Sequence, residues 1–216
     1  MTENTHIDNS YPIHDKVYRI IHDKILYGLL KPGETLTLRS LASEFDTSVM
    51  PVRDAVRRLS SEGALKLSAS GRITTPVLNI ERFNELIDVR KILEAELARK
   101  AVPRVHGALI GRLESITHNM EVFARQREVT ACLRSNIDFH RTLYLRAQSP
   151  IMLKMLETVW LQLSPTVGYG LSKNWHSLGK LEHSNILNAL KKTDPLDLIL
   201  LIKKDISSCH DLFTNI

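Results

Sequence analysis

Two sets of side chains in this sequence could do chemistry, and they lie in different halves of the chain. The first set consists of nitrogen and oxygen donors: Asn136 and His140, then His183 and Asp205. Residues four apart share one face of a helix, so Asn136 and His140 can act together. Imidazole and oxygen donors on several helices of a bundle can hold a divalent metal ion. Spacing alone leaves open the alternative that each histidine is simply hydrogen-bonded.

The second set is basic. Residues 47–75 contain five Lys or Arg against two Asp or Glu, although residues 1–78 as a whole carry a net charge of only +1. Most of the total surplus of five positive charges therefore lies in the second half of the chain. A local basic surplus fits the phosphate backbone of a nucleic acid. The arginines that we expect to share this surface are Arg39, Arg53, Arg57 and Arg72.

The elements that must position the basic set are short. Residues 1–10 are polar without periodicity, which predicts a flexible N-terminal arm. Apolar residues at spacings of three and four then predict three helices, at 17–28, at 37–45 with Thr37 as N-cap, and at 48–63 with Ser48 as N-cap. After the third helix the period falls to two, which predicts strands at 64–67 and 73–77 around a turn.

Three helices followed by a hairpin is the layout of a winged helix-turn-helix, although a generic small module would show the same periodicity. In such a domain the third helix enters the major groove of DNA and the hairpin reaches the backbone or the minor groove beside it. This arrangement would place Arg53 and Arg57 on the recognition helix and Arg72 near the tip of the hairpin.

The residues of this half resemble the DNA-binding domain of the GntR family of bacterial transcription regulators. The resemblance is carried by Pro32-Gly33-Glu34, Leu36, Arg39, Leu41-Ala42, the run from Ser48 to Leu59, Glu62-Gly63 and the turn at Gly71. It implies DNA contacts at Arg39, Ser48, Arg53 and Gly71. Val49 stands where the family usually has an arginine that reads guanine. An apolar side chain there could touch a thymine methyl group, so we expect an operator that departs from the usual half-site at this base.

The second half of the chain reads as helical almost throughout. The expected helices cover 81–102, 109–123, 132–147, 151–163, 178–190 and 195–212, with breaks at Pro103, Ser149-Pro150, Ser164-Pro165 to Gly170, and Thr193 to Pro195. The predicted fold class is therefore mainly α: an N-terminal winged helix-turn-helix followed by an antiparallel bundle of about six helices.

This half resembles the FCD domain, the all-helical effector domain of one GntR subfamily. The matching residues are Asp88-Val89-Arg90, Glu94, Asn136, Phe139-His140, Ser149-Pro150, Glu182-His183, Ile186, Ala189-Leu190 and Asp194. The resemblance implies a site for zinc, nickel or manganese at Asn136, His140 and His183, with Asp205 where a third histidine is expected. It also implies that Arg90 faces the pocket, where a guanidinium suits a carboxylate effector. An intrahelical pair of Arg90 with Glu94 is the alternative.

Together these features predict a DNA-binding regulator with a winged helix-turn-helix domain at 11–78 and an effector-binding and dimerisation domain at 79–216. We expect a repressor that binds a pseudo-palindromic operator in double-stranded DNA as a homodimer and leaves it when a small carboxylate binds. Two alternatives stay open: a metal-dependent enzyme that uses the histidines, and a DNA-binding dimer without an effector. Two cysteines, no apolar run near 18 residues and no signal-peptide pattern predict a cytoplasmic protein outside the membrane.

Overall fold

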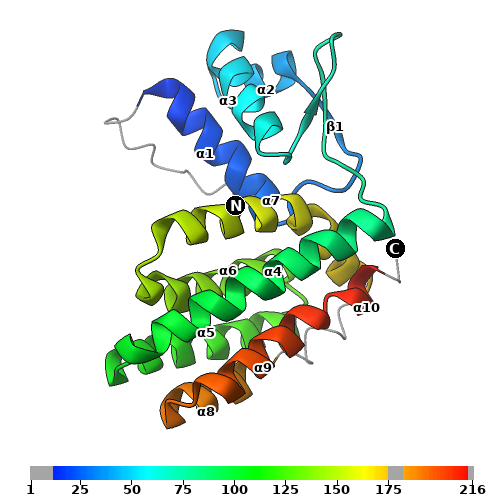
Figure 1. Ribbon diagram of the computed structural model, residues 1–216. Helices are drawn as coiled ribbons and strands as arrows, with labels where there is room; N and C mark the ends of the chain where they lie inside the picture. The colour runs from blue at the N-terminus through cyan, green and yellow to red at the C-terminus, as the bar shows by residue number, and fades with distance from the viewer. Residues whose placement is uncertain (1–11, 175–181, 214–216) are drawn as a thin grey trace.

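The computed structural model describes residues 12–174 and 182–213. It confirms the predicted fold class: a small N-terminal module of helices and a sheet stands on a larger bundle of helices (Figure 1). The expected arm at 1–10 and the first residues of the expected helix at 178–190 lie outside the described residues.

The N-terminal module contains the three expected helices, with modest changes at their ends. They are α1 (Ile13–Leu26), α2 (Leu38–Glu44) and α3 (Val49–Ser61). Thr37 caps α2 as predicted, since its hydroxyl accepts a hydrogen bond from the Ser40 N–H. Ser48 occupies the N-cap position of α3, but its side chain makes no capping hydrogen bond. The Ser48 hydroxyl therefore does not cap α3, contrary to the prediction from the sequence.

The sheet of this module has one strand more than the sequence predicts. The expected hairpin is present as β2 (Lys66–Leu67) and β3 (Arg72–Thr74), both shorter than predicted. A third strand, β1 (Thr35–Thr37), pairs antiparallel with β3 and places Leu36 opposite Ile73, which gives the order β1-β3-β2. The base of the hairpin is thereby fixed to the rest of the module.

Thr75 fastens the end of this sheet to the loop that follows α1. Its hydroxyl accepts a hydrogen bond from the Glu34 N–H at 3.0 Å and donates one to the Lys31 carbonyl, while its own carbonyl accepts one from the Gly33 N–H at 3.1 Å. Gly33 has φ +74°, in the region that favours glycine. The four residues 76–79 then lead directly into the bundle.

The bundle is built from six long helices among the described residues, in agreement with the prediction. They are α4 (Ile80–Ala101), α5 (Gly107–Gln126), α6 (Val129–Tyr144), α7 (Pro150–Lys173), α8 (His183–Lys192) and α9 (Pro195–Ser207), with shorter turns η1 (Val102–Arg104), η2 (Leu145–Ala147) and α10 (His210–Phe213). Side chains cap three of them: Asn79 accepts from the Arg82 N–H of α4, His106 Nδ1 accepts from the Leu109 N–H of α5, and Asp194 accepts from two N–H groups of α9.

The predicted break at Ser164-Pro165 is wrong, because α7 continues through Pro165 to Lys173. A proline inside a helix removes one backbone hydrogen bond and costs about 3 kcal/mol. Burial offsets this cost here, since the whole stretch from Leu163 to Gly168 is packed inside the protein. The helix therefore runs uninterrupted along the side of the bundle that faces the N-terminal module (Figure 1).

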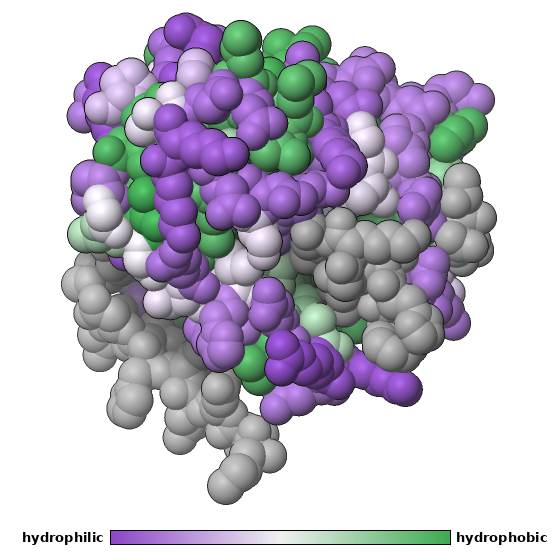
Figure 2. All heavy atoms as spheres, turned by 90° about the horizontal axis from the view of Figure 1, so that it is seen from below, coloured by the Kyte–Doolittle hydropathy of each residue, from purple (hydrophilic) through white to green (hydrophobic). Residues whose placement is uncertain are grey.

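The outer surface is polar where the bundle can be seen from below. Hydrophilic side chains dominate this face, and apolar ones form a few separate patches (Figure 2). No helix in the described part of the chain is long and apolar enough to cross a membrane.

Candidate nucleic-acid interface and buried polar cluster

Helix α3 has a buried side and a basic exposed side. Val52, Val56 and Leu59 are fully buried against α1 and α2. Arg53 and Arg57, one turn apart, are exposed on the opposite side. Arg39, near the start of α2, and Arg72, at the start of β3, are exposed as well. The structure therefore presents all four predicted arginines to the solvent, each from a different position along the module.

These four arginines differ from Arg58 in having no ion-pair partner among the described residues. Arg58 lies over the Tyr18 ring at 3.7 Å and within 4 Å of Asp15 and Glu62, so it is held by the module itself. Arginines that are not paired within the protein keep their guanidinium groups available for phosphate oxygens and base edges. This separates candidate contact residues from structural ones.

The N-terminus of α3 presents a residue that the sequence analysis did not single out. Val49 is only partly exposed and packs against the core of the module, whereas the neighbouring Met50 is 59% exposed. Ser48, just before them, is exposed. At the hairpin, Gly71 has φ +80° and nothing near the position where a side chain would start. An apolar contact with a base at this end of α3 would therefore involve Met50 as well as Val49.

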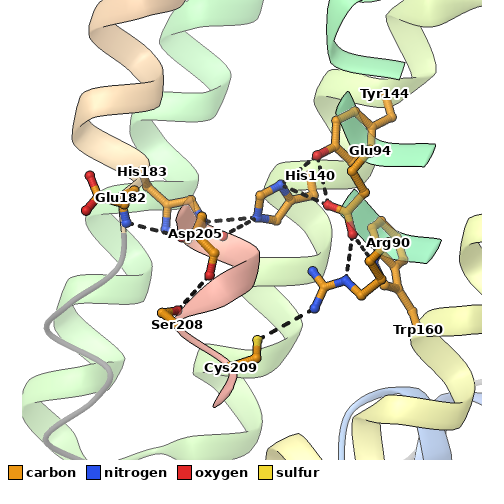
Figure 3. Close-up of polar contacts among 10 residues, drawn as sticks. All are labelled: Arg90, Glu94, His140, Tyr144, Trp160, Glu182, His183, Asp205, Ser208 and Cys209. Carbon is orange, nitrogen blue, oxygen red and sulfur yellow. Dashed lines mark hydrogen bonds and ion pairs between the residues drawn. The ribbon is translucent and has the colours of Figure 1, made fainter. Parts of the chain in front are cut away.

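Three residues of the first predicted set, His140, His183 and Asp205, do come together inside the bundle. The Nε2 atom of His140 on α6 lies 3.2 Å from Asp205 Oδ2 on α9 and 3.4 Å from His183 Nε2 on α8 (Figure 3). The three residues are 1–4% exposed, and their donor atoms lie within 4.8 Å of one another. Such a buried group could hold a metal ion.

Hydrogen bonding fixes which nitrogen His140 offers to this cluster. The Tyr144 hydroxyl donates to Glu94 Oε2 at 2.9 Å, and His140 Nδ1 lies 3.2 Å from the same hydroxyl oxygen. Because the hydroxyl proton points to Glu94, His140 Nδ1 must be the donor to Tyr144, which leaves Nε2 with a lone pair when the ring is neutral. That lone pair faces the Asp205 carboxylate, another acceptor. A cation between them would satisfy both.

The charge states of the cluster fit this arrangement. Burial lowers the pKa of His183 to about 4, even though Asp205 acts in the opposite direction. Burial would raise the pKa of Asp205, but the close approach of the His140 and His183 imidazoles and the hydrogen bond from the Glu182 N–H hold that pKa well below its usual range. A neutral imidazole and an ionised carboxylate are the forms that ligate metals.

Asn136 offers a fourth possible ligand atom, its Oδ1, which has no hydrogen-bond partner among the described residues. Its Oδ1 atom is buried and accepts no hydrogen bond, which is unusual for a buried polar atom. Asn136 and His140 line the same small cavity, as their spacing on α6 predicts. A buried amide oxygen without a hydrogen-bond partner, in the cavity that His140 also lines, could serve as a further ligand for a metal ion.

Arg90 is held by Glu94, the alternative that the sequence left open. Arg90 Nε donates to Glu94 Oε1 at 2.7 Å, and Nη1 reaches Cys209 Sγ at 3.6 Å. Burial would lower the pKa of Arg90, but the Glu94 carboxylate outweighs it and raises that pKa. Arg90 also lines the cavity beside Asn136 and His140, so the pair with Glu94 does not remove it from the predicted pocket.

Glu94 joins the two predicted sites, although the sequence had indicated it only as a partner for Arg90 and as a residue of the FCD resemblance. The carboxylate is fully buried and also accepts a hydrogen bond from Trp160 Nε1 at 2.9 Å (Figure 3). It thus binds Arg90 on its own helix, Tyr144 on α6 and Trp160 on α7. The spacing of four to Arg90 was visible in the sequence, but nothing there indicated the two aromatic donors on other helices.

The cavity itself is small. Its free volume is about 30 Å³, enough for one or two water molecules, and it is lined by Arg90, Leu133, Asn136, Ile137, His140, Trp160, Leu163, Ser164, Val167 and Cys209. Pockets for organic ligands usually measure several hundred Å³. An organic molecule could enter only if the walls moved apart.

A winged helix-turn-helix with four exposed arginines, joined to an all-helical bundle, is the organisation of a DNA-binding regulator. Comparison with known families agrees: residues 13–73 match the family of bacterial regulatory proteins called gntR, and residues 85–206 match the FCD domain. The chain belongs to the GntR family, in the subfamily that carries an FCD domain. This is a family of transcription regulators rather than enzymes, so the enzyme alternative is wrong.

Several known proteins are similar to this chain. The chain is 27% identical over 142 residues to the HTH-type transcriptional regulator McbR of Escherichia coli K12, a match that covers 66% of this chain and 64% of that protein, just under two thirds of it. It is 22% identical to the HTH-type transcriptional repressor RspR of the same organism, over 90% of this chain and 86% of RspR. The solved structure of E. coli McbR/YncC has the same fold, with a TM-score of 0.86 at 21% identity over 94% of this chain and 98% of that one.

Proposed function

We propose that this regulator is a cytoplasmic repressor that binds a pseudo-palindromic operator as a homodimer. The residues proposed to contact DNA are Arg39, Ser48, Val49, Arg53, Arg57, Gly71 and Arg72, within a DNA-binding unit at 11–78. The observation that carries this proposal is the set of exposed arginines without ion-pair partners among the described residues. A two-fold dimer would place its recognition helices in successive major grooves, about 34 Å apart.

Substitution of Arg53 tests the DNA-binding surface. Duplexes that the parent protein selects from a random pool provide the operator, and titrations at several salt concentrations give affinity and salt dependence. We expect Arg53→Ala to weaken binding about tenfold or more, since a good arginine contact to a base contributes about 1–3 kcal/mol. Arg99→Ala is the matched control, because Arg99 is an exposed arginine of the bundle paired with Glu96. Equal effects of both changes would contradict the proposed surface.

The proposed signal is a small carboxylate that enters the cavity and pairs with Arg90. A resident zinc, nickel or manganese ion would be held by His140, His183 and Asp205, with Asn136 as a fourth donor, and would supply a Lewis-acid contact for a carboxylate oxygen. Asp205 stands where a histidine is expected. One of its oxygens faces His140 and the other accepts the Glu182 N–H, so it would offer a single oxygen.

Metal analysis tests the donor set. Protein purified without chelator should contain about one divalent ion per chain, and His140→Ala or His183→Ala should each abolish it. His118→Ala is the control, because His118 lies exposed on α5. A parent protein that contains no metal and takes up none of the three ions would refute the metal site while leaving the DNA-binding proposal intact.

The small volume of the cavity favours one further candidate, a regulator without an effector whose bundle serves only to dimerise. A thermal-shift series with small mono- and dicarboxylates separates the two candidates, because a ligand that binds the folded state raises its apparent stability. A rise that disappears in Arg90→Met supports the carboxylate site. No rise with any of these acids would favour the regulator without an effector.

A further inference from the structure

Helix α7 borders both the cavity and the DNA-binding module. On one side it contributes Trp160, Leu163, Ser164 and Val167 to the cavity wall. On the other side Gln162 and Gly168 touch the N-terminal module, and α7 lies directly beneath α1 in Figure 1. Each residue that touches the module is the sequence neighbour of a cavity-wall residue: Gln162 adjoins Leu163, and Gly168 adjoins Val167. A displaced wall residue therefore displaces a backbone that touches the DNA-binding module.

The first contact is made by the Gln162 side chain at the end of the recognition helix. Gln162 Nε2 donates to the carbonyl of Glu62, the C-cap residue of α3, at 3.0 Å. Gln162 Oε1 accepts from Arg82 Nη2 of α4 at 3.2 Å, which holds the amide in place. Gly63 makes room for it: a Cβ at this position would lie 3.0 Å from the Gln162 amide. The orientation of α3 is thus coupled to the position of Gln162.

The second contact is backbone against backbone. A Cβ on Gly168 would lie 3.0 Å from the Cα of Gly28, and a Cβ on Gly28 would lie 2.9 Å from Leu133 Cδ2. Gly28 follows α1, and Leu133 is itself part of the cavity wall. No side chain between Gly28 and Gly168 could absorb a movement by changing its rotamer, so a shift of α7 at this point is passed to the end of α1.

We propose that α7 couples the volume of the cavity to the orientation of the recognition helix, through Gln162 at Glu62 and through Gly168 at Gly28. This inference rests on the proposed function in one respect, namely that a ligand enters the cavity. Since the cavity holds only about 30 Å³, any organic occupant must push its walls outward. Closely packed interiors transmit such displacements instead of absorbing them.

A side chain that overfills the cavity replaces the unidentified ligand in the test. Val167→Phe adds a ring to the wall, whereas the control Val167→Ile adds one methylene group that the existing cavity can accommodate. Hydrogen exchange of the full chain, followed by mass spectrometry, reports on each segment. We expect Val167→Phe, but not Val167→Ile, to increase exchange at residues 24–30 and 59–64 as well as at the wall, residues 133–140. In a Gln162→Ala background, the increase at 59–64 should disappear while the increase at 133–140 persists.

Increased exchange confined to 133–140 would overturn the proposal, and so would an increase at 59–64 that Gln162→Ala leaves unchanged. If Val167→Phe unfolds the protein, Gly168→Ala is used instead. Its new Cβ would lie 3.0 Å from the Gly28 Cα and so strains the contact between α7 and the end of α1 directly. Exchange should then change at 59–64, which Gly168 does not touch, and a change confined to 24–30 and 133–140 would refute the coupling.

DNA binding gives an independent measurement. Val167→Phe should change the affinity for a selected duplex at least about fivefold relative to Val167→Ile, the lower end of usual allosteric couplings, and Gln162→Ala should reduce that difference. An equal affinity of both Val167 variants, when exchange at 59–64 differs, would overturn the link to recognition. If the parent selects no duplex at all, the proposed function fails, while the exchange experiment still decides whether α7 couples the two parts.

Discussion

Glu94 offers the sharpest test of how the bundle is held together. Its carboxylate accepts hydrogen bonds from Arg90 Nε at 2.7 Å and from Trp160 Nε1 and the Tyr144 hydroxyl, both at 2.9 Å, and it is fully buried. The substitution Glu94→Gln keeps the shape and an acceptor oxygen but removes the charge. It leaves a buried guanidinium without its counter-ion, and breaking a buried ion pair in this way costs about 3–5 kcal/mol.

Urea unfolding followed by circular dichroism measures this loss as a lower midpoint at an unchanged m-value. Glu96→Gln is the control on the same helix, because Glu96 pairs with Arg99 at the surface and such pairs contribute at most about 1 kcal/mol. If the cost of Glu94→Gln arises from the unpaired guanidinium, the double variant Arg90→Met, Glu94→Gln should be more stable than the sum of the single changes implies. Additivity within about 0.5 kcal/mol would refute this reasoning.

Three further predictions concern other parts of the molecule. Burial raises the pKa of the Cys132 thiol to about 11, so the folded state holds this proton more tightly than the unfolded chain does. The free energy of unfolding should therefore fall as the pH rises from about 9 to 11. Urea titrations at each pH would measure this fall, which should be smaller in Cys132→Ala. Gly170→Ala places a Cβ 2.5 Å from the Leu212 carbonyl oxygen and should lower the free energy of unfolding by about 1–3 kcal/mol. Gly111→Ala, with nothing near its Cβ, should instead stabilise α5 by about 0.5–1 kcal/mol. Thermal unfolding compares the two variants, and a change of stability in the same direction in both would contradict the packing argument. Val49→Arg should change the preferred base at one operator position when selection is repeated, and an unchanged preference would reject the predicted role of Val49.

The sequence predicted most of the fold because helix periodicity and capping act locally. Thr37 caps α2 through its own neighbour Ser40, which any reader of the sequence can expect. Strand β1 was missed because three residues, Thr35 to Thr37, are too short to show a period, and their pairing with β3 is a tertiary contact. The break expected at Pro165 failed for a similar reason, since the burial that offsets the proline penalty depends on the packing of distant elements.

The candidate site was likewise predictable in its residue types but not in its tertiary contacts. His140, His183 and Asp205 could be named from their types, and the structure brings them together. Which nitrogen His140 presents depends on Tyr144 and Glu94, and that chain of hydrogen bonds joins residues 50 positions apart. The size of the cavity likewise follows from side chains of several helices and has no counterpart in any single segment.

Thr75 sets the length of chain that can move between the two halves of the molecule. Because its hydrogen bonds tie it to the loop after α1, only residues 76–79 remain between the DNA-binding module and α4. Four residues span at most about 14 Å when fully extended. The proposed homodimer would have two such connections, and together they would not reach an operator whose half-sites were moved apart by a further turn of DNA, about 34 Å. We therefore expect the short connection after Thr75 to limit the half-site spacings that the proposed dimer tolerates, so that its targets in a genome share one spacing.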